Sequence, residues 1–237
     1  MRAIRDIAYA PEHGDRGRLD VLLPDEAEAR PVVVVIHGGG LQALSKERME
    51  GVSAFLVEHD LAVVNTNYRL LPEHPFPAQV EDILAVCRWV RDAAQGELAQ
   101  QDRSRLALLG ASAGGYLAMA AGLMLGRNQI GAIVTISGPV RRRQAADAGD
   151  PLAVPPIELA SADAPPLLAT HSRNDRLVPP EHSIQIVQKL QSLGADARLY
   201  LYDGPGQQHG IWRNEEPPLR LFEHLEAEIA AFLAEVL

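Results

Sequence analysis

Several features that the 237-residue sequence lacks restrict its function. A single cysteine, Cys87, excludes a disulfide within the chain and a cluster of thiolate metal ligands. No run of about 18 apolar residues occurs, so we expect no membrane span. The N-terminus also has no apolar stretch of the length that a signal peptide needs. The net charge of −9 argues against nucleic acid as a partner, because phosphate backbones attract basic surfaces. We therefore expect a cytoplasmic protein.

Short apolar runs that do not alternate with polar residues predict strands covered on both faces, as in a parallel sheet. They lie at residues 32–36, 61–64, 106–109, 132–136, 167–170 and 199–202. Apolar residues at three- and four-residue spacing predict helices, most clearly over 80–90 and 222–236. This alternation predicts a doubly wound, mostly parallel α/β sheet with helices on both faces.

The first two expected strands, 4–9 and 18–23, have no helix between them and should form an antiparallel edge. We expect residues 1–237 to form a single α/β domain. Within it, residues 138–166 join two core strands and are rich in Pro, Ala and Asp. This segment is either a lid over a site or a plain surface excursion.

Residues 110–114 read Gly-Ala-Ser-Ala-Gly and fit the pattern G-x-S-x-G. The pattern alone is weak, but here it follows an apolar strand and precedes a helical segment. A sharp strand-to-helix turn exposes the serine at the helix N-terminus, where backbone N–H groups favour negative charge. Small neighbours leave room for that turn. We therefore predict Ser112 as a nucleophile, the alternative being a helix-capping serine in a packing turn.

Residues 37–40 read His-Gly-Gly-Gly and follow the expected strand 32–36. A glycine run lets backbone N–H groups approach a substrate closely, and the tetrahedral intermediates of acyl transfer need such donors. We predict an oxyanion hole formed by the N–H groups of Gly38, Gly39 and Ala113. A flexible loop or a phosphate cradle is the alternative, although the Gly-Lys-Ser/Thr ending of a phosphate loop is absent. His37 is interpreted as an orienting group.

A serine nucleophile needs a general base, and the base needs a carboxylate to fix its tautomer. His209 lies in a glycine-rich loop after the expected strand 199–202, at the sheet edge where doubly wound folds carry their sites. His171 is the alternative base. Asp175 follows another core strand, and Asp203 is the rival acid. The order Ser112, Asp175, His209 is typical of G-x-S-x-G enzymes on an α/β sheet.

These motifs, together with Asn-Tyr-Arg-Leu-Leu-Pro at residues 67–72, resemble the α/β-hydrolase fold. Within it the chain is similar to the hormone-sensitive-lipase-like and the bacterial feruloyl-esterase-like (BD-FAE) carboxylesterases. Ala111 stands where the former usually carry an acidic residue, and no helical cap precedes the sheet. The resemblance implies a structural role for Tyr68 and Arg69, and we expect Arg69 to pair with Asp82 or Glu73. The run Arg141–Arg143 is interpreted as a solvated loop.

The predicted function is hydrolysis of a small, short-acyl carboxylic ester through an acyl-enzyme on Ser112, with no cofactor and no metal. An arylformamidase or a peptidase would use the same triad, although peptidases of this kind usually carry a gating domain for which 237 residues leave no space. A catalytically inactive ligand-binding protein is a rival from another class. The last helix or an edge strand could support a homodimer, but the sequence does not demand one.

Overall fold

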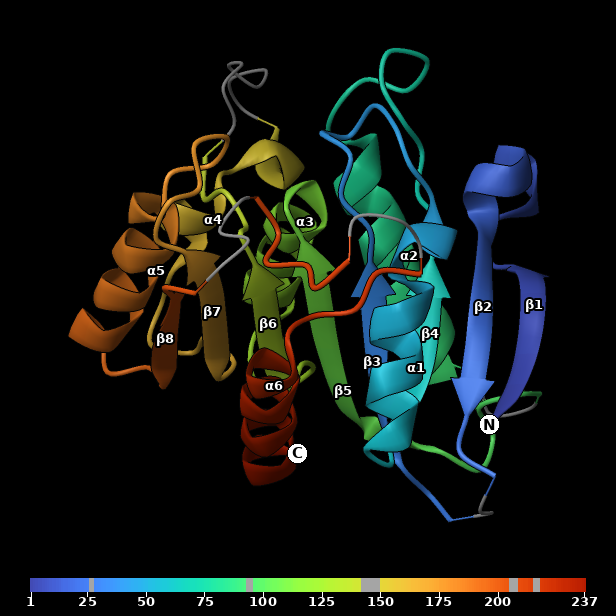
Figure 1. The fold of residues 1–237 in the computed structure, drawn as a ribbon. Helices are drawn as coiled ribbons and strands as arrows, with labels where there is room; N and C mark the ends of the chain where they lie inside the picture. Colours follow the sequence, from blue (N-terminus) through green and yellow to red (C-terminus); the bar gives the residue numbers. More distant parts are fainter. Residues whose placement is uncertain (26–27, 93–95, 142–149, 205–208, 215–217) are drawn as a thin grey trace.

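All strands of the computed structural model, which describes residues 1–25, 28–92, 96–141, 150–204, 209–214 and 218–237, belong to one sheet. Its order is β1-β2-β4-β3-β5-β6-β7-β8 (Figure 1). The strands are β1 (Arg2–Ala8), β2 (Arg18–Leu23), β3 (Pro31–Ile36), β4 (Ala62–Thr66), β5 (Asp102–Ala111), β6 (Ala132–Ile136), β7 (Leu167–Ser172) and β8 (Ala197–Tyr202).

The strand directions confirm the predicted sheet. Strands β3 to β8 pair in parallel, whereas β2 pairs antiparallel with both β1 and β4. The antiparallel edge expected from the first two runs is therefore present. Non-consecutive neighbours, such as β3 beside β5, follow from helical crossovers between the parallel strands.

Helices cover both faces of the sheet, so its central strands are buried on both sides (Figure 1). Along β3, Val32, Val34 and Ile36 face one apolar cluster, and Val33 and Val35 face the other. The first cluster includes side chains of α2 (Ala78–Asp92), α3 (Ala113–Leu125) and α5 (Glu181–Ser192). The second includes side chains of α1 (Glu50–Glu58) and α6 (Glu223–Val236). This double burial explains why the strands read as unbroken apolar runs.

Short helices complete the described chain: η1 (Pro11–Gly17), η2 (Lys46–Met49), η3 (Pro151–Ala153) and α4 (Pro156–Leu159). Both η3 and α4 belong to the segment 138–166, and their residues Ala153 and Ile157 are buried. Residues 142–149, with Arg142 and Arg143, lie outside the described residues. The lid role of this segment stays a prediction. No helix in the described ranges is long and apolar enough to cross a membrane.

The carboxyl ends of the parallel strands meet at one edge of the sheet, which is the upper edge in Figure 1. His37 follows β3 there, Ser112 follows β5 and Asp175 lies just beyond β7. His209 comes after β8 along the chain. The topology therefore brings these four residues to the edge where open α/β sheets bind their ligands.

Candidate active site

Ser112 lies at the tight turn between β5 and α3, as the N-cap of the helix. Its backbone has φ 53° and ψ −119°, in a region that L-residues with side chains rarely adopt. The turn is anchored because the Ser112 N–H donates to the Ile136 carbonyl at 2.8 Å and the Tyr116 N–H donates to the Ser112 carbonyl at 3.1 Å. Strain held in place in this way is typical of functional turns.

Glycines make this turn possible. A Cβ on Gly110 would lie 2.1 Å from the carbonyl oxygen of Gly114, and a Cβ on Gly114 would lie 2.2 Å from that of Ile36. A Cβ on Gly38 would lie 3.3 Å from the Cβ of Ser112. The small residues of the G-x-S-x-G pattern thus allow α3 to pack against the end of β3, and they bring the Gly38 backbone beside the serine.

His209 joins the serine to a carboxylate. Its Nε2 lies 2.7 Å from Ser112 Oγ, and its Nδ1 lies 2.7 Å from Asp175 Oδ2. Because a carboxylate only accepts, Nδ1 carries the hydrogen and Nε2 is left to accept the serine proton. Residues 205–208 of the preceding loop lie outside the described residues. The structure therefore brings together the three side chains that the sequence predicted as a triad.

Asp175 is buried, with its side chain fully shielded from solvent, yet its environment favours the ionised form. Its Oδ1 accepts the N–H groups of Leu177 and Val178, both at 2.9 Å. Burial raises its pKa, but hydrogen bonds from His171, His209 and the Val178 N–H outweigh burial and hold the pKa of this carboxyl well below its usual range. An acceptor that is ionised at neutral pH therefore faces His209.

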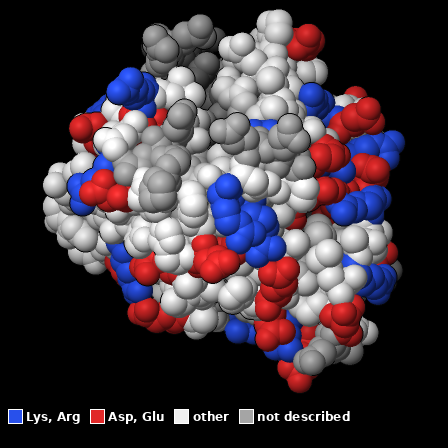
Figure 2. Space-filling view, viewed as in Figure 1, with Lys and Arg blue, Asp and Glu red and all other residues white. Residues whose placement is uncertain are grey.

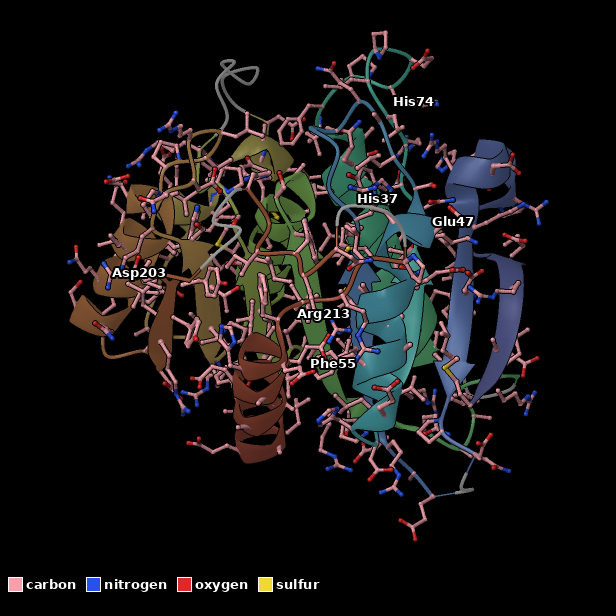
Figure 3. The ribbon with its side chains drawn as sticks, in the orientation of Figure 1. His37, Glu47, Phe55, His74, Asp203 and Arg213 are labelled. Carbon is pink, nitrogen blue, oxygen red and sulfur yellow. The ribbon has the colours of Figure 1, made fainter. Side chains whose placement is uncertain are left out.

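The glycine loop after β3 is braced by His37 and Tyr68. The two rings stack with centroids 4.2 Å apart, and the Tyr68 hydroxyl lies 3.0 Å from the carbonyl oxygens of both His37 and Gly38. His37 Nδ1 lies 2.8 Å from the Gly38 carbonyl, and burial lowers the pKa of His37 to about 4. A neutral, buried ring at the end of β3 (Figure 3) fits the predicted orienting role.

The two rivals for triad positions lie elsewhere. Asp203, labelled in Figure 3, is exposed and lies 3.7 Å from Arg173. His171 is fully buried and contacts Asp175 and Ser183, not the serine nucleophile. The expected ion pair of Arg69 is formed with Asp82, at 2.7 Å.

Sequence reasoning missed a buried charge cluster that joins β1, β2 and η2. Lys46 Nζ lies 2.9 Å from Asp20, 3.0 Å from Asp6 and 2.9 Å from Glu47. Lys46 and Asp20 are both buried. No local sequence pattern predicts their pairing, because the members of the cluster come from β1, β2 and η2, which are distant in the sequence. Among the described residues, no three His, Cys, Asp or Glu side chains are arranged to hold a metal ion.

A family model described as BD-FAE matches residues 19–149, which is more than half of the chain. The chain belongs to the BD-FAE family. A second model, described as the prolyl oligopeptidase family, matches residues 145–237 of this BD-FAE chain. The first match contains the glycine run and Ser112, and the second contains Asp175 and His209.

Curated relatives of this BD-FAE chain carry esterase names. Esterase LipI of Mycobacterium tuberculosis is 45% identical over 96 residues, which cover 40% of this chain and 29% of LipI. Carboxylesterase NlhH of the same species is 44% identical over 88 residues, covering 37% of this chain and 27% of NlhH. The matched segments therefore span less than a third of these relatives. The solved Pyrobaculum calidifontis esterase is 28% identical, with a TM-score of 0.82, and the alignment covers 100% of this chain and 86% of that one.

Proposed function

We propose that this protein is a serine carboxylesterase in which Ser112 is the nucleophile, His209 the general base and Asp175 the residue that orients the base. The observation that carries this proposal is the unbroken chain of two 2.7 Å contacts from Asp175 through His209 to Ser112. A serine, a histidine and a carboxylate in this arrangement can transfer an acyl group without a cofactor or a metal.

In the proposed first step, His209 Nε2 takes the Ser112 proton while Oγ attacks the ester carbonyl. The resulting imidazolium is stabilised by the charge of Asp175, and it then gives the proton to the departing alcohol. In the second step, water attacks the acyl-enzyme and loses its proton to His209. The carboxylic acid leaves as Ser112 Oγ regains that proton.

The N–H groups of Gly38, Gly39 and Ala113 are the proposed oxyanion hole. Two features support this assignment. The Gly38 backbone lies against Ser112, and Ala113 is the first residue of α3, where backbone N–H groups have no partner within the helix. Gly39 has φ +100°, and a Cβ there would lie 2.0 Å from the Ala43 carbonyl oxygen, so only glycine fits this position. Loss of one such donor typically lowers kcat by about a hundredfold or more.

The proposed substrate is a small, short-acyl ester, supported by the esterase names of the relatives.

We also propose that residues 1–237 form one domain, because every described strand belongs to the same sheet. A cytoplasmic location is supported by the single cysteine, Cys87, which is free and buried. A homodimer, if formed, would use α6 or an edge strand, β1 or β8, and the molar mass in solution tests it.

Hydrolysis of p-nitrophenyl acetate, butyrate, octanoate and palmitate by the wild type and by Ser112→Ala tests the ester assignment. We expect turnover of acetate and butyrate, a steep fall at octanoate, and background rates in the alanine variant. Ser104→Ala serves as a matched control, because Ser104 is exposed and contacts Asp102 at the start of β5. Equal rates in wild type and Ser112→Ala would contradict the proposal.

Amide hydrolysis is a second candidate, favoured by the match of residues 145–237 to the prolyl oligopeptidase family. The triad is common to both reactions, so the leaving group decides between them. Turnover of an aryl formamide or a peptide p-nitroanilide with a higher kcat/KM than the acetate ester would assign an amidase. We expect the ester to be the better substrate.

A further inference from the structure

His171 lies at the end of β7 and is fully buried, yet the proposed reaction does not use it. Its Nε2 lies 2.8 Å from the Val178 carbonyl oxygen and 3.4 Å from Asp175 Oδ2. Its Nδ1 lies 2.7 Å from Ser183 Oγ, on the first turn of α5. The ring therefore connects the carboxylate that orients the general base with the helix packed beside it.

These contacts require a hydrogen on one nitrogen of the ring. The Val178 carbonyl and the Asp175 carboxylate are both acceptors, so Nε2 must carry a hydrogen. The Ser183 hydroxyl can donate to or accept from Nδ1, so that contact is satisfied in either case. The hydrogen on Nε2 therefore lies between the Val178 carbonyl oxygen and Asp175.

The ring also acts through the turn that holds Asp175. Val178 donates its N–H to Asp175 Oδ1 at 2.9 Å while its carbonyl oxygen faces His171 Nε2 at 2.8 Å. Asp175 Oδ2 is meanwhile shared between His209 Nδ1 at 2.7 Å and His171 Nε2. Both carboxylate oxygens are thus linked to His171. Oδ2 contacts the ring directly, and Oδ1 is linked to it through the N–H and the carbonyl group of Val178.

We propose that His171 is a positioning residue, which holds the Asp175 carboxylate in the orientation that His209 needs. This role rests on the proposed function, because it requires Asp175 to act on His209. His171 does not touch the reacting atoms. Its N–H restrains rotation of the carboxylate.

Two amide substitutions separate the contacts of the ring. The amide nitrogen of glutamine can take the place of Nε2, whereas the shorter asparagine reaches only the place of Nδ1, beside Ser183. We expect His171→Asn to lower kcat by about 10- to 100-fold, the size of effect that a misplaced catalytic group produces. KM should change by less than about twofold, because substrate binding does not use Asp175. His171→Gln should restore most of kcat, to within about threefold of wild type.

A double-mutant cycle with Asp175→Asn distinguishes a positioning role of His171 from a general packing role. If His171 acts through the carboxylate, His171→Asn should change kcat by less than about threefold in the Asp175→Asn background, since coupled residues are non-additive. Ser183→Ala is the matched control, because it removes the Nδ1 contact and leaves both Nε2 contacts. It should keep kcat within about threefold of wild type. Melting temperatures of all variants establish that each one is folded at the assay temperature.

Equal losses of kcat in His171→Asn and His171→Gln would overturn the proposal, as would the same fold-loss from His171→Asn in both backgrounds. Either result would mean that the ring only fills space. Ser112→Ala is assayed in parallel with p-nitrophenyl acetate. Activity retained in that variant would refute the proposed function itself, which is a different outcome from an additive cycle.

Discussion

Asp175 illustrates how burial and hydrogen bonding act in opposite directions on one side chain. Burial alone would favour the neutral acid, but Asp175 accepts two backbone N–H groups and lies beside two histidines. The net effect is a pKa held below the usual range of an aspartate. A carboxyl whose pKa is lowered in the folded state stabilises that state above its unfolded pKa, which is about 3.9. This stabilisation is lost as the pH falls through the folded pKa.

We therefore expect the free energy of unfolding of the wild type to fall more steeply below about pH 4 than that of Asp175→Asn. Urea unfolding of both proteins between neutral pH and the most acidic pH at which both stay folded measures this difference. Asp203→Asn is the matched control, because Asp203 is exposed and lies 3.7 Å from Arg173. It should follow the wild-type curve, and parallel curves for wild type and Asp175→Asn would show that Asp175 is not held ionised.

The residues of the triad could be predicted because each lies in the segment that follows a parallel strand, in a recognisable chain order. Ser112 has a local pattern, and Asp175 and His209 follow from topology. The contact between His171 and Asp175 could not be predicted. It depends on the turn that places the Val178 carbonyl oxygen 2.8 Å from His171 Nε2. Spacing alone left His171 as an alternative base.

Among the elements, the strand-turn-helix unit of β5 and α3 determines the position of the site. Gly114 lies where α3 meets the end of β3, and a Cβ there would be 2.2 Å from the Ile36 carbonyl oxygen and 2.5 Å from that of His37. Both oxygens belong to backbone that leads directly into the glycine loop. A side chain at residue 114 would therefore push the helix away from the proposed oxyanion hole.

Gly114→Ala should destabilise the protein by about 1–3 kcal/mol, as overpacking usually does. It should also lower kcat for p-nitrophenyl acetate, because the glycine loop and Ser112 move apart. Gly194→Ala is the control: its Cβ would meet open space, and only the φ of +82° is unfavourable. It should cost about 1–2 kcal/mol and leave kcat unchanged. Full activity in Gly114→Ala would contradict the role given to this close packing.

Strand prediction succeeded because double burial produces unbroken apolar runs, and β2 and β6 have the bounds expected from the sequence. Helices were expected between the apolar runs, but the bounds of α1 were not predicted. Helix α1 has only nine residues and contains Gly51, so its own helical preference is weak. Packing decides its formation: Phe55 and Leu56 are fully buried, and Gly51 lies against the Leu219 carbonyl oxygen. Such long-range contacts leave no periodic signal in the sequence.

At the scale of the whole molecule, acidic and basic side chains are interspersed on the face that Figure 2 shows. The buried cluster around Lys46 differs from these surface pairs because it ties β1, β2 and η2 together. Burial lowers the pKa of Lys46, but contacts with Asp20, Glu47 and Asp6 outweigh it and raise the pKa above its usual value. Lys46 therefore stays charged, and its loss would leave the buried Asp20 carboxylate with Arg5, at 2.8 Å, as a charged partner.

Lys46→Met should destabilise the fold by about 1–3 kcal/mol, the usual cost of losing a charged hydrogen-bond partner, because Arg5 still pairs with Asp20. For a chain of this size the melting temperature should fall by about 2–12 °C. Arg2→Met is the control, because the pair of Arg2 with Glu97 is largely exposed and should contribute less than about 1 kcal/mol. Equal melting temperatures for the two variants would show that the buried cluster adds nothing beyond a surface pair.

The central claim is that Ser112 forms the acyl-enzyme, and covalent trapping tests it most directly. The wild type and Ser112→Ala are incubated with an alkyl fluorophosphonate, and intact-mass and peptide mass spectrometry locate the adduct. We expect one adduct per chain, on the peptide that contains Ser112, with loss of p-nitrophenyl acetate hydrolysis in proportion to labelling. Labelling of another residue, or full hydrolysis by a completely labelled enzyme, would contradict the account.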